Sequence, residues 1–165
     1  MYEVRELSVD HWHLLRDVRL RALDDSPGAL WAYGPEQDWA RPEWTHLFHG
    51  AKWLVAESED GVVGVLRSVP DDERSRSRRL ESIWVDPGHR QRGICSSMLR
   101  KIIELEAAED VLYLWLWVIA DNDMAIKVYR HLGFERTEED PKPLPLDQEG
   151  HELRLRLRIA DRLST

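Results

Sequence analysis

The sequence has 165 residues, of which 42% are hydrophobic and 33% are charged, and its formal net charge is −8. These values are ordinary for a globular protein, and we predict a single domain over residues 1–165. They argue against a membrane partner, because no stretch approaches the roughly 18 apolar residues of a spanning helix. They also argue against nucleic acid, because binding a phosphate backbone requires clustered cations.

The amino terminus and the cysteine content predict a cytoplasmic protein. Residues 1–7 read M-Y-E-V-R-E-L, with two acids and no apolar segment typical of a secretory signal. Cys95 is the only cysteine, so an intrachain disulfide is impossible and a reducing compartment is the simplest interpretation. The acidic balance is compatible with a cationic substrate such as an amine.

Hydrophobic periodicity and turn residues divide the chain into alternating strands and helices. We predict strands over residues 2–7, 53–58, 62–69, 80–85, 111–119 and 151–159. Helices are predicted after an N-cap at Asp10, over residues 42–48 and 92–107, and from Asn122 to a left-handed cap at Gly133. This order of elements predicts a mixed α/β domain built around one central sheet.

Two of the predicted strands differ in their patterns. Residues 111–119 are apolar on both faces, which is typical of a central buried strand. Residues 151–159 alternate strictly, with leucine or isoleucine at every second position, which predicts a half-buried strand.

The stretch R-Q-R-G-I-C-S-S-M (residues 90–98) lies at a predicted strand-to-helix corner. The first backbone N–H groups of a helix have no intrahelical partner, and the helix dipole makes that end an anion site. Gly93 lets the backbone approach a phosphate closely, and the neighbouring basic, amide and hydroxyl side chains add donors. Taken alone, the pattern favours a simple chain turn beside solvated arginines, because short glycine motifs are weak signals.

Two motifs in this half of the chain resemble those of the GNAT superfamily of acyl-CoA-dependent N-acyltransferases. The family's phosphate motif, R/Q-x-x-G-x-G/A, corresponds to residues 90–95 and follows V-D-P at residues 85–87. The family's second element, N-x-x-A-x-x-x-Y-x-x-x-G-F, corresponds to Asn122, Ala125, Tyr129, Gly133 and Phe134. The resemblance by motif covers residues 80–134 and extends over most of the chain by order of elements.

The resemblance implies a fold and an activity. The fold is a mixed, mostly antiparallel sheet of about seven strands flanked by about four helices, with the fourth and fifth strands splayed. The activity is transfer of an acetyl group from acetyl-CoA to a primary amine, directly within a ternary complex, without a metal. The acceptor is a small molecule or a peptide, the partners do not include nucleic acid or a membrane, and the protein is a monomer or a homodimer.

The resemblance also implies roles for individual residues. Cofactor contacts fall on Ile83, Trp84, Val85, Arg90, Gln91, Arg92, Gly93, Ile94, Cys95, Ser96 and Asn122. Tyr129 is the expected acid for the departing thiolate, and Glu81 is the expected base. Trp31 and Tyr33, with other aromatic residues nearby, fall in the region that lines the acceptor pocket of the family.

Each of these roles has an alternative that the sequence leaves open. Asn122 also suits the N-cap of its helix, and Tyr129 also suits packing between helix and sheet. Glu81 is equally consistent with a carboxylate that pairs with Arg78 or Arg79 or faces solvent. In that case a water chain acts as the base. Cys95 replaces the usual Gly or Ala of the motif, and either packs as a small residue or has a pKa lowered by the helix terminus.

Two other functions are also compatible with the sequence. The first is an acyl-CoA-binding sensor or interaction module that has no turnover. The second is the modification or binding of RNA-linked acceptors, which the acidic composition disfavours. The sequence names neither the acceptor nor the acyl length.

Overall fold

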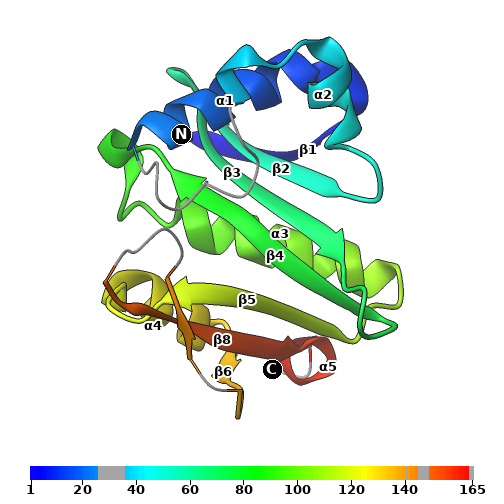
Figure 1. The fold of residues 1–165 in the computed structure, drawn as a ribbon, viewed down its shortest axis with the longest axis vertical. Helices are drawn as coiled ribbons and strands as arrows, with labels where there is room; N and C mark the ends of the chain where they lie inside the picture. The colour runs from blue at the N-terminus through cyan, green and yellow to red at the C-terminus, as the bar shows by residue number, and fades with distance from the viewer. Residues whose placement is uncertain (26–35, 140, 145–148, 164–165) are drawn as a thin grey trace. The chain divides into compact units, whose positions relative to one another are not determined.

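The computed structural model describes residues 1–25, 36–139, 141–144 and 149–163 (Figure 1). Its strands are β1 (Tyr2–Leu7), β2 (Lys52–Ser58), β3 (Gly61–Pro70), β4 (Ser77–Val85), β5 (Tyr113–Ile119), β6 (Glu135–Arg136), β7 (Lys142–Pro143) and β8 (His151–Arg158). Its α-helices are α1 (Trp12–Asp25), α2 (Arg41–His46), α3 (Ile94–Ala108), α4 (Asp123–His131) and α5 (Ile159–Leu163).

The predicted fold class is confirmed. Within the described residues, eight strands form one mixed sheet in the order β1-β2-β3-β4-β5-β8-β6, with β7 paired to β8. The strands pair antiparallel in β1–β2, β2–β3, β5–β8, β6–β8 and β7–β8, whereas β4 and β5 pair in parallel. The elements beyond the expected seven strands and four helices are short, such as the two-residue β7 and the five-residue α5.

The chain divides into two compact units. Unit 1 comprises Met1–Val69 and Ser82–Ile102, and unit 2 comprises Pro70–Glu81 and Ile103–Thr165. Both β4 and α3 contribute residues to each unit. The single domain over residues 1–165 therefore stays a prediction.

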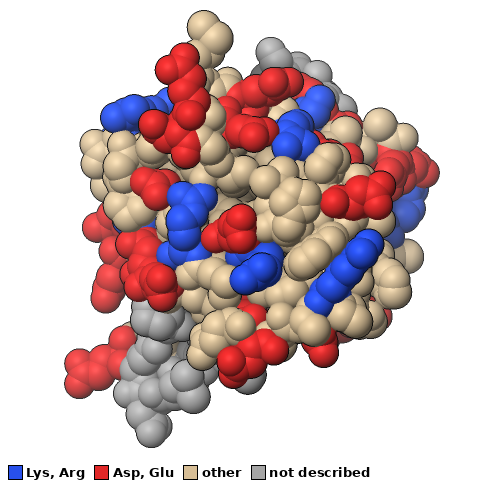
Figure 2. All heavy atoms as spheres, turned by 90° about the horizontal axis from the view of Figure 1, so that it is seen from above, with Lys and Arg blue, Asp and Glu red and all other residues tan. Residues whose placement is uncertain are grey.

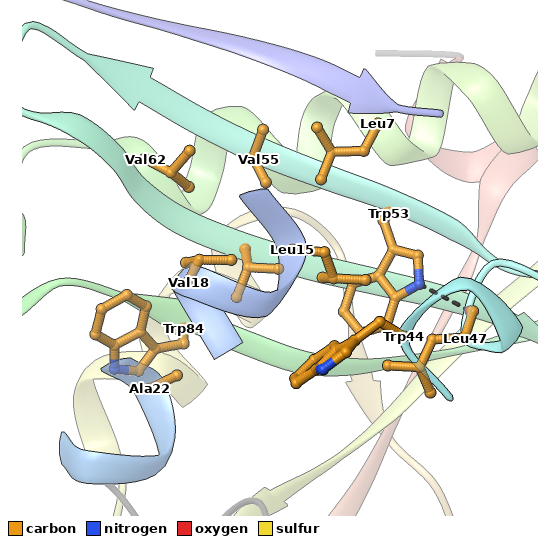
Figure 3. Packing of buried hydrophobic residues seen from close by; sticks show 11 residues of the cluster. Leu7, Leu15, Val18, Ala22, Trp44, Leu47, Trp53, Val55, Val62 and Trp84 are labelled. Atoms are coloured by element: carbon orange, nitrogen blue, oxygen red, sulfur yellow. Dashed lines mark hydrogen bonds between the residues drawn. The ribbon is translucent and has the colours of Figure 1, made fainter. Parts of the chain in front are cut away.

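The core of unit 1 lies between the helices α1 and α2 and the strands β1, β2, β3 and the end of β4 (Figure 3). Its buried members are Leu7, Leu15, Val18, Ala22, Trp44, Leu47, Trp53, Val55, Val62, Val65 and Trp84. Trp53 is fully buried, and its indole N–H donates to the Leu47 carbonyl over 2.9 Å. The apolar helical and strand periodicities of the sequence thus meet in one cluster, and this cluster fixes α1 and α2 on the sheet.

The first turns of α3 pack on β3 in unit 1. A Cβ built at Gly64 in β3 would lie 3.1 Å from Met98 Cε and 3.2 Å from Ile94 Cγ2. Only glycine leaves room for so close a helix, because real side-chain contacts are rarely that short. The position of the start of α3 therefore depends on the size of residue 64.

Unit 2 is built on the antiparallel pair β5 and β8, which stay in register from Tyr113↔Arg158 to Ile119↔Glu152. Leu114, Leu116, Leu155 and Leu157 are buried on one side of this pair. The half-buried strand predicted at the end of the chain is confirmed, except that it ends at Arg158 and Ile159 begins α5. Arg154 also departs from the alternation, because it is buried on the polar face.

Several helix boundaries differ from those predicted. The prediction of Asp10 as an N-cap was wrong, because a 3-10 turn over Val9–His11, with Ser8 as its N-cap, precedes α1. The helix predicted from residue 92 begins at Ile94, because Gly93 has a left-handed φ of 79°. The left-handed cap at Gly133 is confirmed, with a φ of 99°.

Candidate active site

The corner predicted from R-Q-R-G-I-C-S-S-M is a shaped loop in unit 1. Asp86 caps a 3-10 turn over Pro87–His89 by accepting from the Gly88 N–H over 2.9 Å. The chain then takes left-handed φ angles of 61° at Gln91 and 79° at Gly93. The Ser97 N–H donates to the Gly93 carbonyl over 3.0 Å, in the bonding pattern of the first helical turn of α3.

This geometry presents the N-terminus of a 15-residue helix behind a loop of unusual backbone conformation. The N–H groups of the first turn have no intrahelical acceptor, and the helix dipole adds positive potential there. A Cβ at Gly93 would meet one protein atom, the Tyr2 hydroxyl, at 3.7 Å, which is an ordinary contact. The glycine is therefore required by its backbone angle rather than by protein packing, and the loop is suited to a phosphate group.

The side chain of Arg90 holds the loop to the end of β4. Its Nε donates to the Val85 carbonyl over 2.9 Å, and its guanidinium forms an ion pair with Asp25. Asp25 also accepts from the indole N–H of Trp84 over 2.9 Å. Trp84 is buried, so only its backbone is available to a ligand. Arg90 is thus engaged in shaping the loop, whereas the sequence suggested a donor to the cofactor.

The pKa of the Cys95 thiol is raised, whereas one of the two alternatives from the sequence was a lowered pKa. Burial raises the pKa of the Cys95 thiol to about 11. The helix N-terminus does not overcome that desolvation, so the hypothesis of a lowered pKa was wrong. Cys95 is a protonated, partly buried side chain at neutral pH.

The strand β4 carries a backbone irregularity at Ser82, which has a left-handed φ of 54°. The Arg19 guanidinium donates to the Ser82 hydroxyl over 3.0 Å from α1, within unit 1. Arg19 also forms a hydrogen-bonded ion pair with Glu36, and both side chains are fully buried. This cluster could not be predicted from the sequence, because Arg19 occupies an apolar-face position of α1 and no local pattern points to its partners.

Glu81 lies in unit 2, on β4. Its carboxylate is half-buried and accepts from Arg79 Nε over 3.1 Å, as in the ion-pair alternative. The pairing of β4 with β5 comprises three residue pairs and ends at Arg79↔Trp115, although β4 continues to Val85 and β5 to Ile119. After Glu81, β4 passes from unit 2 into unit 1, and the splaying of the two strands stays a prediction.

Asn122 and Tyr129 lie at the start and in the last turn of α4, also in unit 2. The Asn122 side chain accepts from the Ala125 N–H over 3.2 Å, which makes it the N-cap. Tyr129 is buried, and its ring lies edge-on to Phe134 with centroids 6.0 Å apart. Both packing alternatives are thus present in the structure, and neither precludes a contact with a ligand.

The expected acceptor-side aromatic residues divide into two groups. Trp31 and Tyr33 lie outside the described residues. Trp44 is fully buried in the core of unit 1, and Trp39 packs edge-on against it with ring centroids 5.2 Å apart. Trp44 therefore supports the fold.

Other candidate sites are limited. Among the described side chains, no group of three or more His, Cys, Asp or Glu residues is arranged to hold a metal. The helices within the described ranges are too short or too polar to span a bilayer. On the face drawn in Figure 2, acidic and basic side chains are interspersed and no continuous basic surface is present.

A sequence model of the Acetyltransferase (GNAT) family matches residues 12–134. This range includes the loop over residues 91–93, the left-handed residue Ser82 of β4, Asn122 and Tyr129. The chain belongs to the GNAT family. The family resemblance inferred from the two motifs is therefore confirmed.

Curated relatives are similar over part of their length. An uncharacterized N-acetyltransferase of Methanocaldococcus jannaschii is 31% identical over 119 residues, which are 64% of this chain and 50% of that protein. An L-amino acid N-acetyltransferase of Escherichia coli is 38% identical over 91 residues, 52% of this chain and 54% of that protein. A ribosomal protein bS18-alanine N-acetyltransferase of Salmonella typhimurium is 37% identical over 99 residues, 60% of this chain and 63% of that protein. The matches span about half the length of these curated relatives.

Solved structures show the same fold over nearly the whole chain. A Salmonella typhimurium structure, yncA with acetyl-CoA, has a TM-score of 0.77 at 16% identity and covers 96% of this chain and 94% of that one. A Thermoplasma acidophilum N-acetyltransferase in complex with coenzyme A has a TM-score of 0.71 at 14% identity and covers 96% of this chain and 99% of that one.

Proposed function

We propose that this GNAT protein is an N-acetyltransferase that moves an acetyl group from acetyl-CoA to a primary amine by direct transfer in a ternary complex. The observation that carries the proposal is the loop over Gln91–Gly93, whose two left-handed residues lead into the N-terminus of α3. A loop of this kind fits the pyrophosphate of coenzyme A, because its amide donors and helix dipole favour a dianionic group. Family membership and relatives named as N-acetyltransferases support the same activity.

In this proposal, the cofactor is held mainly by backbone atoms. The N–H groups from residue 90 to residue 96 bind the pyrophosphate, and the backbone of Ile83, Trp84 and Val85 binds the pantetheine arm. The Val85 carbonyl already accepts from Arg90, so one acceptor of that strand is shared with the loop. Asn122 uses its oxygen for the helix cap, which leaves its amide N–H₂ group for the cofactor arm.

The transfer itself requires a neutral amine, a stabilised oxyanion and a proton for the departing thiolate. Tyr129 is the proposed proton donor, because a phenol can protonate a thiolate and its burial restricts its ring to few positions. Glu81 is the proposed base, directly or through water. Its carboxylate is half-buried and forms an ion pair with Arg79.

The acceptor is an amine on a small molecule or a peptide. The named relatives act on an L-amino acid in one case and on the alanine of a ribosomal protein in another, so both classes belong in a first panel.

The proposal is tested by measuring free thiol release from acetyl-CoA with a panel of small amines, amino acids and peptides. We expect turnover with at least one acceptor, and a loss of about 10²-fold in kcat for Tyr129→Phe, as for removal of a general acid. Tyr113→Phe is the matched control, because Tyr113 is a half-buried tyrosine on β5 outside the proposed site. Tight coenzyme A binding without release for any amine would favour the non-catalytic sensor, and unchanged release by Tyr129→Phe would remove that residue from the mechanism.

A further inference from the structure

His89 lies on the 3-10 turn that leads into the loop over residues 91–93, within unit 1. Both nitrogens of its imidazole ring face a carboxylate. Nδ1 lies 3.2 Å from Asp86 Oδ1, and Nε2 lies 3.1 Å from Asp60 Oδ2. Asp60 belongs to the β2–β3 turn, so His89 links that turn to the entrance of the loop. The proposed acetyl transfer assigns His89 no role.

The two carboxylates differ in their surroundings. Asp86 Oδ1 also accepts from the Gly88 N–H over 2.9 Å, and Asp86 Oδ2 lies 3.5 Å from a guanidinium nitrogen of Arg21. Burial would raise the pKa of Asp86, but His89, the Gly88 N–H and Arg21 lower it overall. The Asp60 side chain is 76% exposed, so its contact with His89 has the strength of a surface ion pair.

The protonation state of the ring decides whether both contacts of His89 are favourable. A neutral imidazole carries one N–H, so it can donate to only one of the two carboxylates, and the lone pair of its other nitrogen then faces an oxygen. An imidazolium donates from both nitrogens. Histidine ordinarily changes charge between about pH 5 and pH 8. The bridge from Asp86 to Asp60 is therefore complete only when His89 is protonated.

The bridge restrains the backbone where the proposed pyrophosphate donors begin. The Asp86 N–H donates to the Val63 carbonyl over 2.8 Å, which holds the start of the turn to β3. His89 ends the turn and is followed directly by Arg90, the first of the residues whose N–H groups are proposed to bind the pyrophosphate. A loop that is restrained before binding loses less conformational entropy when the ligand binds.

We infer that His89 is a positioning residue of this loop, and that its protonation between Asp86 and Asp60 strengthens coenzyme A binding as the pH falls. The inference rests on the proposed function, because it takes the loop as the pyrophosphate site. Arg21, from α1, is the cation that faces Asp86, and it also donates to the Val62 carbonyl. The affinity gained is present below the histidine range and is lost as the pH rises through it.

The probe is dephospho-coenzyme A, which keeps the pyrophosphate but lacks the 3′-phosphate, a group that itself titrates near about pH 6. Calorimetric titration of the whole protein measures its affinity at constant ionic strength. We expect binding about threefold tighter at about pH 5.5 than at about pH 8, the effect of an exposed ion pair. Buffers with different heats of ionisation should show that binding takes up a fraction of a proton within this range.

Three variants assign the pH dependence to the bridge. His89→Gln keeps a hydrogen-bonding side chain that cannot become a cation, and it is expected to lose both the pH dependence and the proton uptake. Asp60→Asn removes the exposed carboxylate that only the imidazolium serves, and it is expected to lose most of the pH dependence. His151→Gln replaces an exposed histidine on β8 in unit 2 and should keep the wild-type profile.

The outcomes separate this inference from the proposed function. Equal affinity of the wild type at both pH values would overturn the role of His89 and leave the cofactor site in place. The same holds if His89→Gln binds more weakly but keeps the wild-type pH profile, which is the result of a purely structural role. A protein that binds neither dephospho-coenzyme A nor coenzyme A at any pH would overturn the proposed cofactor site, and the role of His89 with it.

Discussion

The most consequential single residues of this protein are polar groups whose behaviour is set by burial. Arg19 and Glu36 form a fully buried ion pair, and Arg19 also holds the Ser82 hydroxyl at the irregular turn of β4. Cys95 loses acidity by burial in spite of its place in the first turn of a helix. In both cases desolvation is large, and the outcome depends on whether a partner compensates for it.

Removing one member of the buried pair is expected to be costly. Arg19→Met should lower the free energy of unfolding by about 3–5 kcal/mol, because it leaves Glu36 buried without its cation. Adding Glu36→Gln should recover part of that loss, since the uncompensated charge is then gone. Urea unfolding of the two single variants and the double variant measures the coupling. Additive losses would show that the pair does not act as a unit.

The thiol of Cys95 is expected to be unreactive in the folded protein. A pKa of about 11 against an ordinary 9.0 leaves about 100-fold less thiolate at neutral pH. Labelling by a thiol reagent at pH 7 should therefore be slower by at least that factor than labelling of the urea-unfolded chain. Equal rates would mean that the helix terminus activates this thiol after all.

At the scale of elements, the proposed cofactor binding depends on the backbone conformation of the strand-to-helix corner between β4 and α3. The loop needs a left-handed residue on either side of Arg92, and one of the two, Gln91, is not a glycine. Arg90 fastens this loop to the carbonyl that ends β4, and Gly64 lets the following helix lie close to β3. The bond of Arg90 to the end of β4 and the packing of α3 on β3 thus hold the backbone of the corner without a ligand.

Gly93→Val tests the corner against a matched glycine. Gly61 also has a left-handed φ, of 95°, and open space around its Cβ position, but it is the first residue of β3, directly after the β2–β3 turn. Both Gly93→Val and Gly61→Val are therefore expected to destabilise the protein through backbone strain.

Only Gly93→Val should lose the rise in Tm that coenzyme A produces, because its side chain occupies the phosphate position. Each variant is compared with its own Tm without ligand. If coenzyme A stabilises both variants to the same extent, the cofactor lies elsewhere.

At the scale of the whole molecule, acidic groups with opposite pKa shifts govern the response to pH. Burial alone would raise the pKa of Asp71, but hydrogen bonds from Glu73, Ser77 and Trp115 and the charge of Arg154 lower it overall. Burial also opposes the shift at Asp86, whose pKa is lowered overall by His89, the Gly88 N–H and Arg21. Burial raises the pKa of Glu152, and Lys142 only partly offsets it.

These directions predict how stability changes with acid. A lowered pKa means that Asp71 and Asp86 stabilise the fold above their ordinary value of 3.8, and that this contribution disappears as the pH falls through the folded pKa. Asp71→Asn and Asp86→Asn should therefore lower the free energy of unfolding at pH 7 and flatten its decline below pH 4.

Glu152 should behave in the opposite sense. Its contribution is present below the ordinary value of 4.5 and is lost as the pH rises through the raised folded pKa. Glu152→Gln should therefore leave stability at pH 7 unchanged or raise it. Denaturant unfolding at several pH values measures all three variants, and a loss of stability at pH 7 for Glu152→Gln would contradict the sign.

The succession of strands and helices, the mixed sheet and the family could all be predicted from the sequence. These properties follow from local patterns, because hydrophobic periodicity and turn residues act over a few neighbouring positions. The motif at residues 90–95 and the spacing from Asn122 to Phe134 were equally readable, since a loop and one helix contain them.

The behaviour of the buried polar groups could not be predicted, because it depends on tertiary packing. The Arg19–Glu36–Ser82 cluster, the raised pKa of Cys95 and the contact of His89 with Asp60 all arise between segments distant in the chain. Burial and hydrogen-bond partners are set by packing, and packing brings together residues whose separation no local pattern records. For that reason the strand-to-helix corner at residues 90–98 was visible in the sequence, whereas the Arg19–Glu36–Ser82 cluster was not.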